Sequence, residues 1–245
     1  MGQLTLKVAG SVIEIQTRDR ISSRLFRSFL SNETPDLCVS LPQEEIRVVE
    51  TFHDKSQDMN GWAGNISISY VLQQVANAML DQNTLLFHGA TVAFHGYAYM
   101  FSAPSGTGKT THIRKWLDQL PDAFVVNGDK PFVKLLKDGG LPLACGSPWA
   151  GKENLYTNTM VPLKSIILME RCEDNHIEQI SFAEAFPSLL KQVYRPDDED
   201  KMRKTLRLMQ YLNPEVSFWR FQCNNFMDDC FDVAYNALVC GNSEI

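Results

Sequence analysis

The chain has few cysteines and histidines, and neither kind is grouped. Its six cysteines and five histidines are scattered over 245 residues. They show no C-x-x-C spacing, and the cysteines are not arranged in regularly spaced pairs. A zinc site needs closely spaced ligands, and a disulfide framework is typical of shorter secreted chains. We therefore expect buried, reduced cysteines, no metal cluster of this kind and a cytoplasmic location.

The sequence also lacks an excess of positive charge and any long apolar run. Its 23 lysines and arginines are outnumbered by 29 aspartates and glutamates, which gives a formal net charge of −6. Such a molecule has no general attraction to nucleic acid or to an acidic membrane surface. No stretch approaches the roughly 18 apolar residues of a membrane span, and residues 1–7 do not resemble a secretory signal. We expect no nucleic-acid partner and no membrane association.

What the sequence does contain is a phosphate-binding loop at residues 103–111, APSGTGKTT. It fits the Walker A pattern G/A-x-x-x-x-G-K-S/T, with a strand-like segment before it (97–101) and a helix-like segment after it (112–120). The glycines at 106 and 108 let successive amides turn toward an anion, and the start of the helix adds the positive end of its dipole. The alternative is a glycine-rich turn without a ligand, which the order of strand, loop and helix disfavours.

Each residue type of this loop has a role in holding a nucleotide. Lys109 is expected to reach the β- and γ-phosphates of ATP, and the Thr110 hydroxyl to ligate Mg²⁺. The first position is Ala103 rather than glycine, which weakens the match slightly. The predicted ATP-binding residues are Ser105, Gly106, Thr107, Gly108, Lys109, Thr110 and Thr111.

The remaining pattern is that of an α/β protein. Short alternating segments at 4–8, 11–15, 38–41 and 46–50 predict a small N-terminal β-rich lobe, followed by a helix at about 69–81. Further strands are expected at 84–88, 89–94, 97–101, 123–126, 132–136, 141–145, 164–169 and 216–221, and helices at 112–120, 182–193, 199–212 and 227–239. The predicted hairpin within 132–145 argues for a mixed rather than a wholly parallel sheet.

Several motifs in a fixed order resemble the HPr serine kinase/phosphorylase family. They are Leu86-Phe-His-Gly89, a β-hairpin, Ser105-Gly-Thr-Gly-Lys-Thr110 and Gly128-Asp129. That family shares its core with phosphoenolpyruvate carboxykinase. The resemblance therefore implies a P-loop kinase core of that type at residues 83–245, with a mixed β-sheet flanked by helices, behind an N-terminal lobe and linking helix at 1–82.

Three further segments are similar to the smaller HPr-kinase-like proteins found beside peptide-modification clusters, such as lasso-peptide kinases. They are Asn127-Gly-Asp-Lys-Pro131, Gly146-Ser-Pro-Trp-Ala-Gly-Lys-Glu153 and Tyr194-Arg-Pro196. The resemblance covers about residues 84–240.

The resemblance also implies roles for single residues. His88 matches a histidine that lies near the reacting phosphate in HPr kinases. Asp129 matches the second of two adjacent aspartates that serve magnesium and the acceptor hydroxyl. Asp129 also ends an apolar strand, where a Walker-B-like carboxylate belongs, although an aspartate there could instead cap a turn. Gly128 stands in place of the first aspartate, so the general base is left open between His88 and Glu153.

Two loops carry the remaining candidates. Glu153 lies in the polar loop 146–154, beside a Trp149 that we expect to be exposed. It either contacts substrate or metal, or belongs to an ordinary solvated ion pair. Arg195 either supports the phosphates or pairs with the acidic run 197–200, which is expected to cap a helix.

The sequence as a whole predicts an ATP- and Mg²⁺-dependent kinase that phosphorylates a serine hydroxyl of a peptide, a small protein or free serine. Asp129, His88, Glu153 and Arg195 are the catalytic candidates, and Thr110 and Asp129 the metal ligands. The glycine-rich segment that HPr kinases use in phosphorolysis is not evident, so reverse phosphorylase activity is not expected.

Two rival functions remain. The first is a nucleotide-binding switch or accessory protein without transfer activity, motivated by Gly128. The second is a carboxykinase acting on a small carboxylic acid, for which 245 residues is short. The sequence leaves open the acceptor, the choice between ATP and GTP, and whether the chain forms a homo-oligomer.

Overall fold

The computed structural model describes residues 2–17, 26–41, 62–212 and 214–241. The predicted strand at 46–50 lies outside these residues. Within them, no helix is long and apolar enough to cross a membrane.

The N-terminal lobe is a three-stranded sheet. Strands β1 (Gly2–Val8) and β2 (Ser11–Thr17) form an antiparallel hairpin, and β3 (Leu37–Ser40) runs parallel to β2. The two-residue turn, Ala9 and Gly10, has positive φ angles of 50° and 73°, the conformation that matches the twist of paired strands. A short 3₁₀ turn, η1 (Arg27–Phe29), packs beside this hairpin.

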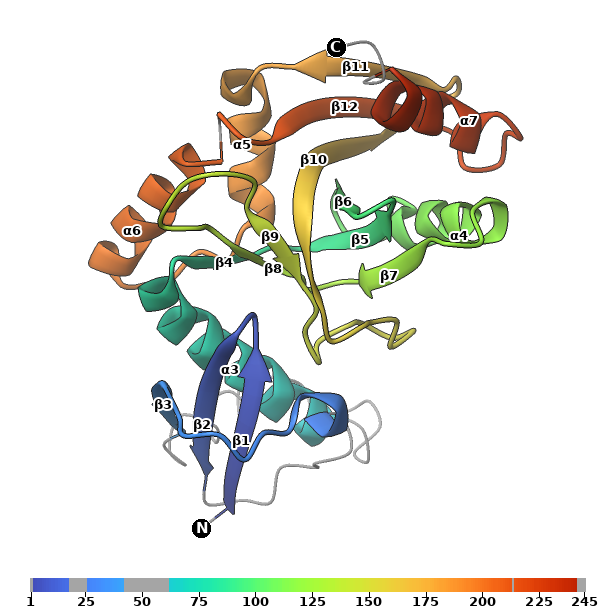
Figure 1. Ribbon diagram of the computed structural model, residues 1–245. Coiled ribbons are helices and arrows are strands. Elements are labelled where there is room, and N and C mark those ends of the chain that lie inside the picture. Colours follow the sequence, from blue (N-terminus) through green and yellow to red (C-terminus); the bar gives the residue numbers. More distant parts are fainter. Residues whose placement is uncertain (1, 18–25, 42–61, 213, 242–245) are drawn as a thin grey trace.

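Helix α3 (Trp62–Met79) leads from this lobe to the main sheet and ends in the 3₁₀ turn η2 (Leu80–Gln82) (Figure 1). It begins at Trp62 rather than near residue 69 as predicted. Its first two turns include Gly64, Ile66 and Ile68. These residue types have lower helix propensity, so the sequence there does not indicate a helix. The lobe and the main sheet share one cluster of buried side chains, to which Phe26, Phe132 and Trp149 contribute. The domain boundary between residues 82 and 83 stays a prediction.

The main sheet has nine strands and is mixed, as the sequence predicted. Its order is β4-β8-β9-β10-β6-β5-β7, with β12 pairing with β10 and β11 with β12. The pairs β6–β10 and β10–β12 are parallel and all others are antiparallel. The strands are β4 (Thr84–Leu86), β5 (Gly89–Phe94), β6 (Tyr97–Ser102), β7 (Phe124–Asn127), β8 (Phe132–Lys134), β9 (Leu143–Cys145), β10 (Met160–Arg171), β11 (His176–Ile180) and β12 (Ser217–Cys223).

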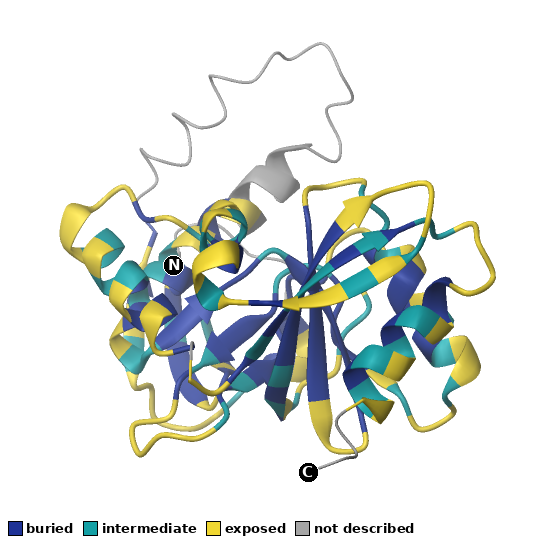
Figure 2. Cartoon of the chain, turned by 90° about the horizontal axis from the view of Figure 1, so that it is seen from above, coloured by how far each residue is buried: buried dark blue, intermediate teal, exposed yellow. Residues whose placement is uncertain are grey.

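Helices cover both faces of this sheet. Alternate residues of β6 point to opposite sides: Ala98 and Met100 join one buried cluster, while Tyr99 and Phe101 join another. Helices α5 (Phe182–Gln192) and α6 (Glu199–Gln210) contribute to the first cluster; α4 (Lys109–Gln119), α7 (Cys230–Tyr235) and the π-helical turn η3 (Asn236–Cys240) contribute to the second. Figure 2 shows the buried strands between helices whose outer faces are exposed. Such two-sided burial explains the nearly continuous apolar runs of the central strands.

Strand β11 and the last helix also differ from the prediction. Strand β11 was not predicted, because it is an edge strand with mostly exposed residues and little apolar alternation. The last helix begins at Cys230 rather than Met227, because a turn built on Asn224 precedes it: Oδ1 of Asn224 accepts from the amide of Phe226, and its carbonyl accepts from the amide of Met227. The acidic run does cap α6 as expected, since Oδ1 of Asp198 accepts from the Lys201 amide at 2.9 Å.

Candidate functional site

The sheet topology gathers several of the predicted site residues, among them Lys109, His88 and Asp129, at one edge. The parallel strands β6, β10 and β12 end there, at Ser102, Arg171 and Cys223. Strand β7 runs in the same direction as β6, because both are antiparallel to β5, and it ends at the same edge at Asn127. Gly89 at the start of β5 pairs with Ser102, so His88 lies there too. The carboxyl ends of strands in open α/β sheets are where ligands usually bind.

The predicted phosphate-binding loop at residues 103–111, called the P-loop below, leaves β6 at this edge and runs into α4. Its two glycines have φ angles of 81° (Gly106) and 112° (Gly108), both in the region that disfavours other residues. At Gly108 the close approach of a neighbour adds a second constraint. A Cβ there would lie 2.3 Å from Nδ2 of Asn225, which donates to the Gly108 carbonyl at 3.2 Å. Both glycines of the motif are therefore required by the backbone.

Two side chains donate hydrogen bonds to the backbone carbonyls of this loop. Nζ of Lys109 donates to the carbonyls of Ala103 and Pro104 at 2.8 and 3.2 Å. The Arg171 guanidinium donates to the carbonyls of Gly106 and, at 3.5 Å, Thr107. Because its carbonyls are held in this way, the loop can direct its backbone amides toward an anion.

Three amides of this loop are unpaired, whereas that of Thr107 donates to the Pro104 carbonyl at 3.4 Å. Among the described residues, the amides of Gly106, Gly108 and Lys109 donate to no backbone or side-chain acceptor. Free amides at the start of an 11-residue helix such as α4, next to glycines in positive-φ conformations, form a concavity suited to an anion.

Lys109 supplies a cation that its surroundings only partly neutralise. The residue is 7% exposed. Burial lowers the pKa of its ammonium group, and the negative charge of Asp129 opposes that effect only in part. A phosphate placed against Lys109 would supply the missing negative charge.

His88 and Asp129 form a hydrogen-bonded pair beside the P-loop. Nε2 of His88 lies 3.3 Å from Oδ1 of Asp129, and Nδ1 lies 3.1 Å from Oε1 of Gln192 on α5. The backbone is fixed as well: the His88 amide donates to the Gln192 carbonyl at 2.8 Å, and the Ser102 hydroxyl donates to the His88 carbonyl at 2.8 Å. The imidazole is thus held from both sides.

Asp129 is an ionised carboxylate. Burial alone would raise its pKa, but the hydrogen bond from His88 and the positive charges of Lys130, His88 and Lys109 together hold its pKa below the ordinary value. Nζ of Lys130 lies 4.0 Å from Oδ2. One carboxylate oxygen therefore faces His88 and the other faces a lysine.

The turn that carries Asp129 is built by Asn127. The fully buried Asn127 side chain accepts from the amides of Asp129 and Lys130 at 2.9 and 2.6 Å. Its Nδ2 donates to the carbonyl and the hydroxyl of Ser147, both at 3.0 Å. Asn127 is a positioning residue, and its place at the end of a short apolar strand was the one sequence signal for this role.

The absence of an aspartate at position 128 has a steric reason. A Cβ at Gly128 would lie 3.3 Å from the carbonyl oxygens of Ala150 and Leu155, which is tight for two backbone atoms. Gly151 likewise approaches Asp129, since a Cβ there would lie 3.0 Å from the Cβ of Asp129. The loop 146–154 therefore packs directly on the Asp129 turn and leaves little room for a side chain at position 128.

The remaining candidates lie elsewhere. The Glu153 carboxylate pairs with Arg114 on α4, so the structure does not bring it to His88. Arg195 is exposed, and across the described ranges it forms no ion pair, either with a site residue or with the acidic run after it. The expectation of an exposed Trp149 was wrong: it is 5% exposed and packs edge-on against Phe26 of the N-terminal lobe.

The oxygen donors at this edge fit a magnesium ion. Thr110 offers a hydroxyl at the start of α4, and Asp129 an ionised carboxylate close enough to Lys109 to affect its pKa. Mg²⁺ binds through one or two such protein oxygens together with substrate phosphates and water. In the described part of the chain no three His, Cys, Asp or Glu side chains form a metal-binding group, and an Mg²⁺–nucleotide site does not need one.

A cavity of about 360 Å³ opens beside His88. It lies between α3, β4 and the end of α5, and its polar lining includes Gln73, His88, Lys130 and Lys191. Leu72 and Val193 add apolar surface. The sequence did not predict this cavity or the Lys130 and Gln192 side chains that line it. It also did not predict that Arg171 and Asn225 contact the P-loop. The position of all four residues at the site depends on the order of the strands.

Known proteins resemble this chain in structure rather than in sequence. No protein-family model matches the chain, and no curated protein matches it. Among solved structures, the HPr(Ser) kinase/phosphatase from Coxiella burnetii is similar over 62% of this chain and 89% of its own, with 9% sequence identity and a TM-score of 0.38. An identity and a TM-score this low carry no argument about function.

Proposed function

We propose that this protein is an ATP- and Mg²⁺-dependent kinase that transfers the γ-phosphate to a serine hydroxyl of a peptide, a small protein or free serine. One observation carries the proposal: a P-loop with unpaired amides and a buried lysine lies at the same sheet edge as the His88–Asp129 pair. A phosphate site next to a proton acceptor is what phosphoryl transfer to a hydroxyl requires.

The P-loop would hold the nucleotide. The amides of residues 105–111 and the Lys109 ammonium would bind the β- and γ-phosphates, with Arg171 fixing the loop from outside. Thr110 and the Asp129 oxygen that faces away from His88 would hold the metal. Bound Mg²⁺ would neutralise charge that develops on the phosphate oxygens. Lys130 adds a second, partly buried lysine beside Asp129; burial lowers its pKa, and the negative charge of Asp129 opposes that effect.

His88 is our choice as general base. Asp129 alone is a weak proton acceptor, because its pKa is held low. An imidazole that receives the hydroxyl proton gains a positive charge, and a carboxylate 3.3 Å away stabilises that charge. Nε2 already faces Asp129, so the hydroxyl would give its proton to Nδ1 and would take the place that Oε1 of Gln192 now holds 3.1 Å from that nitrogen. Glu153 is disfavoured by its ion pair with Arg114.

The acceptor would enter through the cavity beside His88. At about 360 Å³ the cavity is large enough for a small ligand or for one or two residues of a peptide. None of its lining residues belongs to the loop 103–111 or to α4, so the acceptor and the nucleotide would reach His88 along different walls. Lys130 lines it and also contacts Asp129, which links the acceptor side to the phosphate side.

Transfer of labelled phosphate tests the proposal. The protein is incubated with γ-labelled ATP, Mg²⁺ and, separately, free serine, a peptide ending in serine, or HPr. Label is expected on one acceptor with wild type and on none with Lys109→Met. Tight ATP binding without transfer to any acceptor would instead support the nucleotide-binding switch, which Gly128 favours.

A further inference from the structure

The most exposed large apolar side chain in the described part of the chain lies beside the P-loop. Phe226 is 98% exposed, whereas Tyr211, the next in order, is 62% exposed. Phe226 belongs to the loop 224–229, called the β12–α7 loop below because it joins those two elements. Single exposed apolar residues are common on protein surfaces, so the position of this one decides whether it has a role.

Both neighbours of Phe226 are anchored to the P-loop or to its helix. Nδ2 of Asn225 donates to the Gly108 carbonyl at 3.2 Å, and Nζ of Lys115 on α4 donates to the Met227 carbonyl at 3.1 Å. The Phe226 backbone is therefore fixed beside the phosphate site, while its ring makes little contact with the rest of the described chain.

A buried network holds Asn225 in this position. Sγ of Cys230 donates to Oδ1 of Asn225 at 3.4 Å and lies 3.5 Å from Nδ1 of His112. Nε1 of Trp116 donates to Nε2 of His112 at 3.2 Å, so the imidazole proton lies on Nδ1 and points at the sulfur. Cys230, His112 and Trp116 are all fully buried. The core beneath α4 therefore sets the place of the β12–α7 loop.

The order of the strands fixes the direction in which a nucleotide would lie. The P-loop leaves β6, which has β5 and β7 on one side and β10 and β12 on the other. His88 and Asp129, which would face the γ-phosphate, lie on the β5–β7 side, next to the start of β5 and the end of β7. The β12–α7 loop lies on the opposite side. A nucleotide with its γ-phosphate toward Asp129 would therefore extend its nucleoside toward Phe226.

Two faces of α4 divide the site in the same way. Thr110, the predicted Mg²⁺ ligand, lies one turn before Arg114, which pairs with Glu153. Thr111 lies one turn before Lys115, which contacts the β12–α7 loop. In a P-loop the amides at the start of the helix hold the α- and β-phosphates. The nucleoside would therefore leave the helix on the Thr111 face, where the β12–α7 loop lies.

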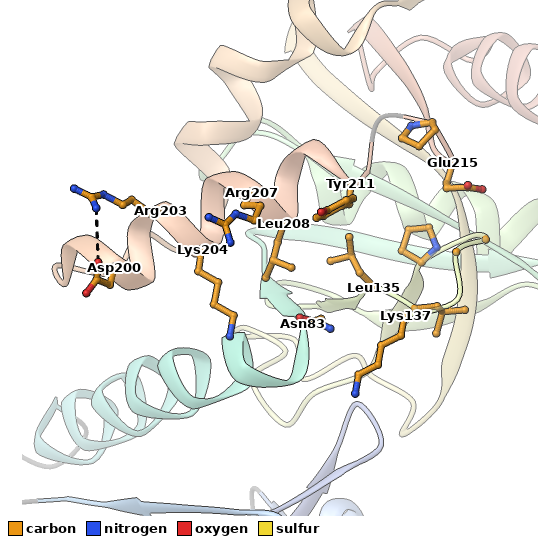
Figure 3. Close-up of a pocket in the computed structure, with 15 residues that line it drawn as sticks. Asn83, Leu135, Lys137, Asp200, Arg203, Lys204, Arg207, Leu208, Tyr211 and Glu215 are labelled. Carbon is orange, nitrogen blue, oxygen red and sulfur yellow. Dashed lines mark ion pairs between the residues drawn. The ribbon is translucent and has the colours of Figure 1, made fainter.

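Neither of the two cavities can take this nucleoside. The smaller one lies beside His88, and a larger one of about 920 Å³ lies between α6 and the loop that joins β8 to β9 (Figure 3). None of their lining residues belongs to the P-loop, to α4 or to the β12–α7 loop. The nucleoside would instead lie on open surface, where an exposed ring can supply the contact that a cavity wall supplies elsewhere.

The charges of the β12–α7 loop favour an uncharged group beside Phe226. The loop sequence, NNFMDD, contains no lysine or arginine and ends in Asp228 and Asp229. Oδ1 of Asp229 accepts from Nδ2 of Asn175 at 2.6 Å. Two carboxylates repel a further phosphate group but do not oppose a neutral base. An aromatic ring stacks on any base, because every base has a π-face.

We propose that the ring of Phe226 stacks on the base of the nucleotide whose phosphates the P-loop holds. This contact rests on the proposed nucleotide site and adds to it the residue that binds the base. Because stacking tolerates every base, Phe226 contributes affinity and position rather than a choice between ATP and GTP.

Calorimetric titration with a nucleotide and with a phosphate chain alone tests the stacking. The ligands are Mg²⁺-ATP and Mg²⁺-tripolyphosphate, and the proteins are wild type and Phe226→Ala. We expect Phe226→Ala to bind ATP about five- to tenfold more weakly, the lower part of the range for base–aromatic stacking. Its affinity for tripolyphosphate should equal that of wild type. An equal loss for both ligands, or no loss for ATP, would overturn the proposal.

Two further variants make the test specific. Phe124→Ala is the matched control, because Phe124 is 40% exposed at the start of β7, and that strand reaches the site with its other end. It should leave both affinities unchanged, and a loss equal to that of Phe226→Ala would contradict the proposal. Phe226→Trp should keep the affinity for ATP. Its added fluorescence should be quenched by ATP and not by tripolyphosphate; quenching by both ligands or by neither would contradict stacking.

The nucleotide site and the stacking contact fail in different ways. Absence of binding of either ligand by wild type would contradict the proposed function and the stacking contact with it. Equal affinities of wild type and Phe226→Ala for ATP would exclude the stacking contact and leave the phosphate site standing. A Phe226→Ala protein that binds ATP normally but loses self-association would assign the ring to a contact between copies of the chain instead.

Discussion

The imidazole Nε2 of His88 lies 3.3 Å from Oδ1 of Asp129, and the Gly89 amide donates to the Asp129 carbonyl at 3.0 Å. Side chain and backbone together fix the residue before β5 against the turn after β7. Because the loop 103–111 leaves the neighbouring strand β6, this contact helps to place the proposed proton acceptor relative to the proposed phosphate site.

Replacing His88 should separate catalysis from nucleotide binding. His88→Ala is expected to lower the rate of phosphate transfer by on the order of 100- to 10,000-fold, because it removes the general base. The affinity for Mg²⁺-ATP should change little, since the P-loop is intact. His176→Ala, at an exposed position of β11, is the matched control. A full rate with His88→Ala would assign the base elsewhere.

Asp129→Asn should show a pH-dependent loss of stability. The Asp129 pKa lies below its ordinary value in the folded protein, so its carboxylate stabilises the fold above about pH 4 and loses this effect as the pH falls through the lowered pKa. Urea unfolding from about pH 7 to about pH 3 should show the wild type more stable than Asp129→Asn, by a margin that shrinks toward acid. Asp138→Asn, in an exposed loop, should change stability little at any pH. A difference in the free energy of unfolding between wild type and Asp129→Asn that stays constant with pH would contradict the lowered pKa of Asp129.

Arg171→Gln should weaken nucleotide binding without unfolding the protein. The guanidinium is exposed and holds two P-loop carbonyls, so its loss frees the loop to move. We expect an affinity for Mg²⁺-ATP reduced by about tenfold, the size of one charge-assisted hydrogen bond. Arg220→Gln removes an arginine paired with Glu178 on the neighbouring strands and should leave the affinity as it is. If both variants bind equally well, Arg171 does not support the loop.

Placing an aspartate at position 128 should not raise the proposed rate of transfer. Gly128→Asp places a Cβ 3.3 Å from two backbone carbonyl oxygens, so we expect a loss of about 1–3 kcal/mol in the free energy of unfolding and a lower rate of transfer. Thermal unfolding and the transfer assay report the two effects separately. A stable and faster Gly128→Asp protein would show that the turn can open and that a lone carboxylate limits the wild type.

The sequence predicts local chemistry better than long-range contacts. The P-loop, the mixed sheet and the capping of α6 by Asp198 follow from short patterns, because each depends on neighbouring residues. Arg171, Gln192 and Asn225 reach the site only because β10, α5 and β12 end beside it, which no spacing along the chain reveals. Trp149 was expected in solvent for the same reason: its partner Phe26 lies in the N-terminal lobe.

The central claim is that the loop at 103–111 holds the phosphates of ATP through Lys109, and calorimetric titration with Mg²⁺-ATP tests it most directly. Lys109→Met keeps the apolar length of the side chain and removes a buried charge whose pKa burial lowers, so this variant should fold. The wild type should bind one nucleotide per chain, and Lys109→Met should bind it about 10- to 100-fold more weakly. Equal affinity for both proteins, or no binding by the wild type, would contradict the claim.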